Sequence, residues 1–395
     1  MSRTYYHKID PAVRNAVKVA ADEPCRVILY AKEYEKVKPL LDGMGVKVSA
    51  EIPLIQGYVV EFPSSQLNRL AGQRQVKYIA ADLDIKAQMR IASQAVHVDA
   101  LHKAGITGRD VGIAVLDTGI YPHPDFTMPR NRIAAFQDIV NGRTSPYDDN
   151  GHGTFVSGVA AGSGYASNGV YKGIAPDAHI VSIKVMDEMG NGRSSDVLSA
   201  LQWVADNYSK YNIKVVSMSL GTFAGDVRRD DAMVRGVETL WKRGITVIAA
   251  AGNEGPDPST ITVPGISPVI LTVGSVDDKR TVDTSDDTIP DFSSRGPVRS
   301  RVKPDVVAPG VNIVSVNADK EYLPGRKQNK LQNNYTVMSG TSVSTPLVAG
   351  VVALLCQKHP DWSPDIIKSR IMGSASHVTG QLNLEGRGMI QVQNF

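Results

Sequence analysis

Three side chains in this sequence, those of Asp117, His152 and Ser342, are of the types that nucleophilic catalysis needs. A serine hydroxyl can attack a carbonyl carbon when an imidazole takes its proton, and a carboxylate can hold that imidazole in the correct orientation. Glycine stands within two residues of each of the three, and such small neighbours allow a substrate backbone to come close. Together, they could carry out acyl transfer through a covalent intermediate.

Each of these residues also has an ordinary structural interpretation. Asp117 follows the apolar run 111–116 and could cap a turn, while His152 could be a solvated residue or a helix cap. Ser342 precedes the apolar run 347–355 and could be an N-cap, although free amides at a helix N-terminus could equally stabilise an oxyanion. The chain order Asp, His, Ser favours the catalytic interpretation, because one known type of serine-protease triad has that order.

The elements that must position these residues point to an α/β fold. Apolar, β-branched runs alternate with helical stretches over the larger, C-terminal part of the chain; the runs are 111–116, 180–185, 215–219, 246–250 and 269–273. Such runs are typical of strands buried on both faces, and they predict a parallel sheet flanked by helices. In that architecture, functional groups gather at the carboxyl ends of the strands.

The N-terminal part has a different pattern, which predicts a small α+β ferredoxin-like domain. Expected strands at 25–31, 46–55, 58–62 and 76–81 and expected helices at 35–43 and 65–72 follow one another in the order βαββαβ. A further helix is expected over 10–23. The predicted organisation is therefore a helical extension at 1–23, the small domain at 24–84, a linker at 85–95 and the large domain at 96–395.

Several segments, taken in order, resemble the subtilase family of serine proteases (peptidase S8). They are DTGIYPHPDF, DDNGHGTFVSGVAAG, SMSLG, AAAGNEGP, FSSRGP, KPDVVAPG, SGTSVSTPLVAG and GRGMIQVQ. Within the family the chain looks most like the bacterial AprX-type intracellular subtilases, through DTGIYPHPDF and the DDNGHGT that follows it. The resemblance covers about residue 96 to the C-terminus and implies a self-processing serine endopeptidase with a subtilisin-like catalytic domain.

The resemblance also implies a role for each matching residue. Ser342 would be the nucleophile, His152 the general base and then acid, and Asp117 the group that orients the imidazole. Asn253 would donate its side-chain amide to the oxyanion, together with the backbone N–H of Ser342. The alternative for Asn253 is a turn-forming asparagine.

Substrate binding in this family adds a peptide as an extended strand, and the resemblance places the receiving strand at 217–221. The resemblance also places the pocket for the substrate side chain before the cleaved bond (P1) farther along the chain. The positions that match the strand are Ser217, Met218, Ser219, Leu220 and Gly221. Those that match the pocket walls are Ala250, Ala251 and Gly252, with Thr262 near its base. Because these walls are small, we expect a preference for large apolar P1 residues and, as partners, protein or peptide substrates.

The small domain resembles the subtilase propeptide, which implies an intramolecular inhibitor and folding aid. Excision is expected between about residues 84 and 93, by the chain's own active site. The alternative is a permanent regulatory or docking domain.

Composition excludes some partner classes. The net charge is +3 and no long basic run occurs, so nucleic acid is not an expected partner. The apolar run 347–355 is too short to cross a membrane. The N-terminal residues have no secretory pattern, which predicts a cytoplasmic protein; export by another route, or a signal already removed, is the alternative.

No cofactor is expected for the chemistry, and the two cysteines form no metal-binding pattern. Structural calcium is an open expectation. Its weak candidates are Asp138, Asp148 and Asp149, for which a solvated acidic loop is the favoured alternative.

Two rival functions remain open at the level of the sequence. One is a catalytically silent relative that acts as a binding scaffold, although all four catalytic positions hold competent residues. The other is a serine esterase, because the same triad cleaves esters.

Overall fold

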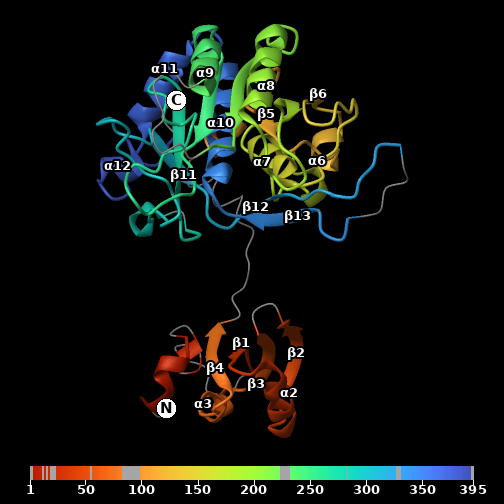
Figure 1. Ribbon diagram of the computed structural model, residues 1–395, viewed down its shortest axis with the longest axis vertical. Coiled ribbons are helices and arrows are strands. Elements are labelled where there is room, and N and C mark those ends of the chain that lie inside the picture. Colours follow the sequence, from red (N-terminus) through yellow and green to blue (C-terminus); the bar gives the residue numbers. More distant parts are fainter. Residues whose placement is uncertain are drawn as a thin grey trace. The chain divides into compact units, whose positions relative to one another are not determined.

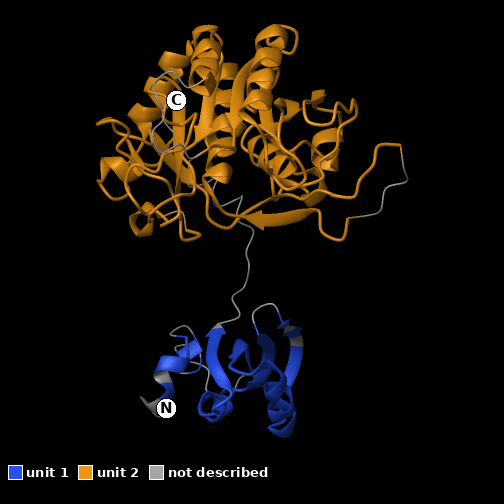
Figure 2. Cartoon of the chain, viewed as in Figure 1, with its two compact units in different colours: residues 1–86 blue, residues 87–395 orange. Residues whose placement is uncertain are grey.

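The structure is a computed structural model that describes residues 3–10, 13–14, 17, 24–53, 56–81, 98–222, 232–281, 283–325 and 331–392. The chain divides into two compact units, Met1–Lys86 and Ala87–Phe395, each of which is described by itself (Figure 2). The expected linker at 85–95, the expected excision segment and most of the helix expected at 10–23 lie outside the described residues.

The first unit contains the predicted βαββαβ sequence of elements. They are η1 (Arg3–Lys8), β1 (Pro24–Ala31), α2 (Tyr34–Gly43), β2 (Lys47–Ile52), β3 (Gly57–Pro63), η3 (Ser64–Gln66), α3 (Leu67–Ala71) and β4 (Val76–Ala81). The strands form one antiparallel sheet in the order β2-β3-β1-β4. This is the predicted α+β arrangement.

Alternation along β1 explains why this sheet has a buried face. Val27 and Leu29 are fully buried, and so are Val37 and Leu41, which lie four residues apart on α2. Side chains two apart on a strand and four apart on a helix share one face, so these two faces pack against each other.

The second unit is built on a seven-stranded sheet in which every pair of neighbours is parallel (Figure 1). Its order is β11-β10-β9-β8-β5-β7-β6. The strands are β5 (Gly112–Asp117), β6 (Ile133–Asp138), β7 (His179–Lys184), β8 (Ile213–Met218), β9 (Thr246–Ala250), β10 (Leu271–Val276) and β11 (Val306–Pro309). The parallel α/β prediction is confirmed, and five of these strands overlap the apolar runs.

The remaining described elements of this unit are helices and one antiparallel pair. The helices are α5 (Asp99–Lys103), α6 (Pro124–Thr127), α7 (His152–Ala161), η4 (Tyr165–Ser167), α8 (Ser194–Asn207), α9 (Ala232–Lys242), η5 (Thr284–Asp286), α10 (Thr341–Lys358), α11 (Pro364–Ser374) and α12 (Leu382–Glu385). The pair is β12 (Ile313–Val316) with β13 (Tyr335–Met338).

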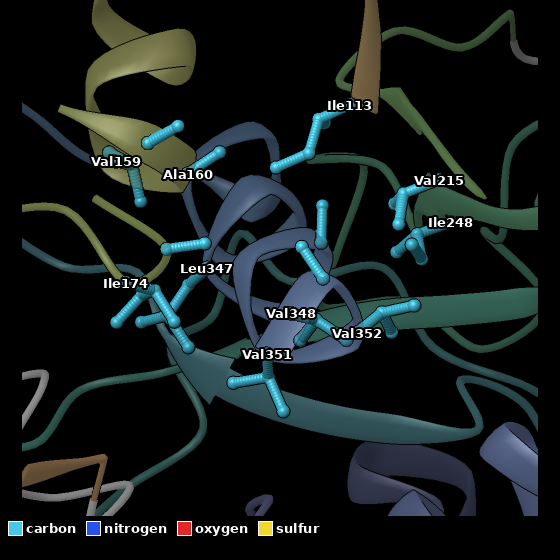
Figure 3. Close-up of a cluster of buried hydrophobic side chains, with 14 of the residues drawn as sticks. Ile113, Val159, Ala160, Ile174, Val215, Ile248, Leu347, Val348, Val351 and Val352 are labelled. Atoms are coloured by element: carbon cyan, nitrogen blue, oxygen red, sulfur yellow. The ribbon is translucent and has the colours of Figure 1, made fainter. Parts of the chain in front are cut away.

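Successive side chains of β5 point to opposite faces of the sheet, and helices cover both faces. Ile113 and Val115 belong to the core that includes α7 and α10, whereas Ala114 and Leu116 belong to the core that includes α8 and α9. Figure 3 shows the first of these cores, with Ile113, Val215 and Ile248 near the side chains of α10. Burial on both faces is why the strands are apolar throughout.

Helix α10 runs through the centre of this core. It is long and apolar enough to cross a membrane by length and composition alone, but 78% of that stretch is buried inside the unit. Gly350 allows its close approach to the neighbouring chain, because a Cβ there would lie 2.6 Å from the Cβ of Ile174. It is therefore a core helix, and its first turn carries Ser342.

Candidate active site

The candidate catalytic residues lie at the carboxyl edge of the parallel sheet. Asp117 is the last residue of β5, which lies between β7 and β8, and the chain crosses over to opposite sides of it. His152 begins α7 and Ser342 lies in the first turn of α10. Where the chain leaves neighbouring strands in opposite directions, a crevice forms at the carboxyl edge, and α/β proteins bind ligands there.

Asp117 and His152 form a hydrogen-bonded pair. Nδ1 of His152 donates to Oδ1 of Asp117 over 2.7 Å, and the backbone N–H of Thr118 donates to the same oxygen over 2.8 Å. Asp117 is 1% exposed, whereas 24% of the imidazole side chain is exposed. The buried carboxylate thus holds Nδ1 in a hydrogen bond and leaves Nε2 as the ring nitrogen that could exchange a proton with a substrate or nucleophile.

Two glycines make this pairing possible. A Cβ on Gly153 would lie only 2.2 Å from the carbonyl oxygen of Gly119, so the start of α7 packs directly against the loop after β5. Gly151, immediately before His152, has a φ of +96°, a left-handed conformation that favours glycine. A side chain at Gly153 would force the start of α7 and the loop after β5 apart, and one at Gly151 would strain the backbone next to His152.

The charges around His152 set its protonation. Burial by itself would lower the pKa of the imidazole, but the negative charge of Asp117, the hydrogen bond to it and the charge of Asp148 outweigh burial, so the pKa of His152 is raised above its ordinary value. A raised pKa makes the neutral imidazole a stronger base.

Ser342 faces the same cleft as His152, and that cleft has a volume of about 520 Å³. Among the described residues, no hydrogen bond joins the Ser342 hydroxyl to the imidazole; such bonds are often long before substrate binds. The hydroxyl of Ser219 donates to the carbonyl oxygen of Ser342 over 2.7 Å. This bond ties the first turn of α10 to the chain that follows β8.

Asn253 lies beside Ser342 with its amide oxygen already engaged. Its Oδ1 accepts hydrogen bonds from the backbone N–H and the hydroxyl of Thr341, at 2.9 and 3.0 Å. A Cβ on Gly340 would lie 3.0 Å from Ser342 Oγ and 3.4 Å from Asn253 Nδ2, so both atoms border the space next to Gly340. Asn253 and Ser342 line the same cleft, and the hydrogen bonds to Oδ1 leave the amide nitrogen of Asn253 as the group that could donate to an oxyanion.

Only part of the expected peptide-binding segment lines the cleft. Ser219, Leu220 and Gly221 do so, whereas Ser217 and Met218 are fully buried inside β8. The facing wall comes from chain that the sequence analysis missed, between β7 and the start of α8. Its cleft-lining residues are Met186, Gly190, Asn191, Gly192, Arg193, Ser194 and Val197. Their types suggested no chemistry, and only their position relative to the other motifs could have indicated them.

The expected P1 pocket residues come together around one threonine. Ala250 and Ala251 are buried, and Thr262 Oγ1 donates to the carbonyl oxygen of Ala251 over 3.2 Å. A Cβ on Gly221 would lie 2.3 Å from Thr262 Oγ1, and one on Gly252 would lie 2.6 Å from its Cγ2. Thr262 therefore fills the space between the two glycine-bearing segments. Of these five residues only Gly221 lines the cleft, so the P1 pocket stays a prediction.

The oxygens of the acidic stretch before His152 accept hydrogen bonds from the chain itself. Asp138 binds the Tyr147 hydroxyl over 2.8 Å, and Asp149 pairs with the fully buried Lys184 over 2.7 Å. Among the described residues, no three Asp, Glu, His or Cys side chains form a group suited to a metal. Calcium at Asp138, Asp148 or Asp149 stays a prediction. The alternative of a solvated loop is wrong for Asp138 and Asp148, which are 2% and 1% exposed.

Asp148 joins the loop after β5 to the start of α7. Its Oδ1 accepts from the Thr118 hydroxyl and from the Gly151 N–H, each at 2.8 Å. Its Oδ2 accepts from the N–H and hydroxyl of Thr154, at 2.8 and 2.6 Å. This role of Asp148, and that of Thr118, were not apparent from the sequence.

Comparison with known proteins gives a consistent result. Residues 108–388 match the family described as Subtilase family, Peptidase S8. The chain is 40% identical to "Serine protease AprX" of Bacillus subtilis (strain 168) over 84% of its length and 77% of that protein, and 32% identical to "Subtilisin E" of the same strain over 91% and 85%. Among solved structures it is similar to "Sphericase", with a TM-score of 0.60, 28% identity and coverage of 73% of this chain and 93% of that one.

Proposed function

Because this chain belongs to the subtilase family and is a subtilisin-type serine endopeptidase, we propose that Asp117, His152 and Ser342 form its catalytic triad. The observation that carries the proposal is the 2.7 Å hydrogen bond from His152 to Asp117, in a cleft that Ser342 also lines. The bond holds the hydrogen on Nδ1 and so keeps Nε2 unprotonated, ready to accept a proton from the serine.

The triad would cleave a peptide in two stages. Ser342 Oγ bonds to the carbonyl carbon while its proton passes to His152 Nε2, and the carbonyl oxygen becomes an oxyanion. His152 then gives that proton to the departing amine as the C–N bond breaks, which leaves an ester on Ser342. A water molecule repeats the sequence with His152 as base, and the acid is released.

Two donors would stabilise the oxyanion, the Nδ2 amide of Asn253 and the backbone N–H of Ser342. The first is supported by the two hydrogen bonds from Thr341, which occupy the amide oxygen of Asn253 and orient its nitrogen. A donor positioned before the reaction needs no reorganisation during it. These steps use only side chains and backbone of this chain, so we propose that the chemistry requires no cofactor.

Labelling with a fluorophosphonate tests the triad. Wild-type protein should label at Ser342, whereas Ser342→Ala should not label and should lose about 10⁶ in kcat, the magnitude known for another member of this family. Ser199→Ala, an exposed serine of α8 away from the cleft, is the matched control and should label. Absence of labelling in correctly folded wild type would favour the silent-scaffold alternative.

We further propose that large apolar residues are preferred at P1. The support is the small size of the walls at Gly221, Ala250, Ala251 and Gly252, with Thr262 near the base. Digestion of a peptide library, read by mass spectrometry, should give cuts mainly after leucine, methionine, phenylalanine and tyrosine. A dominant preference for basic residues would contradict this proposal.

The small N-terminal unit is proposed to be an inhibitory propeptide that the enzyme itself removes. Its support is the antiparallel sheet β2-β3-β1-β4 with helices, the arrangement that the resemblance implied for a propeptide. Incubated wild type should yield two fragments, cut between about residues 84 and 93, while Ser342→Ala should stay one chain. Identical uncut bands, with full activity in wild type, would favour a permanent docking domain.

A further inference from the structure

The loop between β10 and β11 carries an unusual concentration of acid. Five aspartates fall within eleven residues; they are Asp277, Asp278, Asp283, Asp286 and Asp287. None of them belongs to the triad, the oxyanion site or the cleft walls. The loop lies outside the acidic stretch that the sequence analysis considered for calcium.

A short antiparallel bridge brings two of these carboxylates together. The N–H of Asp277 donates to the carbonyl oxygen of Thr288 over 2.8 Å, and the N–H of Thr288 donates back over 3.2 Å. Asp278 and Asp287 are the next residues on the two sides, so their side chains share the face opposite to that of the bridging pair. Both are inside the unit, with 5% and 7% of their surface exposed.

Among the residues that the structure describes, the other acids of the loop have hydrogen-bond or ionic partners, whereas Asp287 has no hydrogen-bond partner. Asp277 pairs with Lys279 over 2.7 Å, Asp283 caps the N–H of Ser285, and Asp286 accepts from the Thr281 hydroxyl. Within the described part of the chain, both carboxylate oxygens of Asp287 are buried without a hydrogen-bond partner.

A buried carboxylate without a partner is unfavourable by several kcal/mol unless it is neutralised or bound to a cation. The antiparallel bridge places Asp278 and Asp287 opposite each other on one face, and among the neighbouring charges that of Asp278 acts most strongly on Asp287. Asp278 engages one oxygen with the backbone N–H of Arg280 over 3.1 Å. The pair therefore presents a concentrated negative charge enclosed by the loop.

We propose that Asp278 and Asp287 bind a calcium ion, with carbonyl oxygens of the loop and water completing its coordination. Calcium takes six to eight oxygen ligands in flexible geometry, whereas magnesium needs a near-ideal octahedron, which an irregular loop does not readily provide. The site offers only two carboxylates, so most of the oxygen ligands would have to be uncharged.

A shared proton is the alternative to a cation at this pair, although the charge of Arg280 acts to lower the pKa of Asp278. Burial, followed by the neighbouring carboxylates, raises the pKa of Asp287 to about 7, and burial raises the pKa of Asp278 to about 6. A cation would relieve this repulsion, while in its absence a proton must do so. Calcium and the shared proton are thus alternative occupants, which an experiment can separate.

The experiment uses the full chain with Ser342→Ala, which prevents self-digestion. After treatment with EDTA, added CaCl₂ at pH 8 should raise the Tm of this parent by about 5 °C when free calcium exceeds its Kd about a hundredfold. Asp287→Asn should lose that shift and bind one calcium fewer per chain by calorimetric titration. Asp283→Asn, an exposed change in the same loop, should keep both.

A second measurement guards against a simple folding defect. In calcium-free buffer at pH 8, Asp287→Asn should melt at or above the parent's Tm, because the amide removes the repulsion between two buried carboxylates. The proposal is overturned if Asp287→Asn keeps the full calcium shift, or if the parent neither shifts nor binds calcium. The second of these results would assign the pair to a shared proton.

Discussion

Thr118 Oγ1 donates a 2.8 Å hydrogen bond to Asp148 Oδ1, and this bond ties the residue after Asp117 to the segment that leads to His152. The same hydroxyl accepts the N–H of Gly153 over 2.8 Å. Asp117 and His152 are 35 positions apart in sequence, so their pairing depends on this local tie. Asp148 is thus a positioning residue whose charge also reaches the imidazole.

Asp148→Asn should change the pH dependence of activity. The charge of Asp148 contributes to raising the pKa of His152, so its removal lowers that pKa. Because the proposed base must be neutral, the acid limb of kcat/KM against pH should move to lower pH, and kcat should fall about tenfold as the imidazole loses its fixed position. The profile should be measured on a short chromogenic peptide.

Thr118 offers a matched pair of variants for the same network. Thr118→Ser keeps the hydroxyl and should retain most of the activity. Thr118→Val removes the hydroxyl and should lower kcat by less than Asp148→Asn does, without moving the acid limb, because the charge of Asp148 stays. If Asp148→Asn is folded and its pH profile coincides with that of wild type, the positioning role is wrong.

Asp117→Asn should lower kcat by about 10⁴ with the fold intact, since an amide can still accept the N–H of Thr118 but no longer secures the reactive tautomer of His152. Its acid limb should also move to lower pH, because the carboxylate raises the pKa of the imidazole. Circular dichroism and Tm serve as controls for folding. Near-wild-type turnover would remove Asp117 from the triad.

Asn253→Ala should lower kcat by about 10² to 10³ with little change in KM, because the proposed donor acts on the oxyanion and not on bound substrate. Thr341→Val should give a smaller loss, about tenfold, because one of the two bonds that hold the amide oxygen is removed. Thr341→Ser keeps this bond and is the control. A rise in KM with kcat unchanged would assign Asn253 to substrate binding instead.

The extent of sequence-based prediction follows from what each pattern encodes. Alternating side chains predicted β1, and apolar runs predicted β3, β5 and β9. Burial on one or both faces of a strand leaves such a pattern in consecutive residues. Two strands of the large sheet were missed. β6 (IAAFQD) is half-buried at the sheet edge, and β11 (VVAP) has four residues and ends in proline.

The residues of the candidate site also fall into two groups, those that a sequence pattern indicates and those that only folding brings together. The order of Asp117, His152 and Ser342 indicated a triad, because the family pattern is linear in sequence. The bonds from Thr341 to Asn253 join residues 88 positions apart, and no spacing rule predicts them. The wall at Gly190–Ser194 was missed for the same reason, since its place beside the triad exists only in the folded chain.

Thr262 provides the sharpest test of P1 specificity. It lies between Gly221 and Gly252, so in the proposed P1 pocket its side chain would limit the depth available to a substrate side chain. Thr262→Gly should raise kcat/KM for phenylalanine at P1 relative to alanine by about tenfold, since about 1 to 3 kcal/mol is the usual value of a methylene-sized change in an apolar pocket. Kinetics on two peptides that differ only at P1 would measure the ratio.

Thr262→Ser is the control for this substitution, because it keeps the hydroxyl that donates to Ala251 and removes only the methyl group. It should give an intermediate ratio. An unchanged ratio in both variants would mean that Thr262 lies outside the P1 pocket, and the walls at Gly221 and Gly252 would then have to enclose the substrate side chain without it.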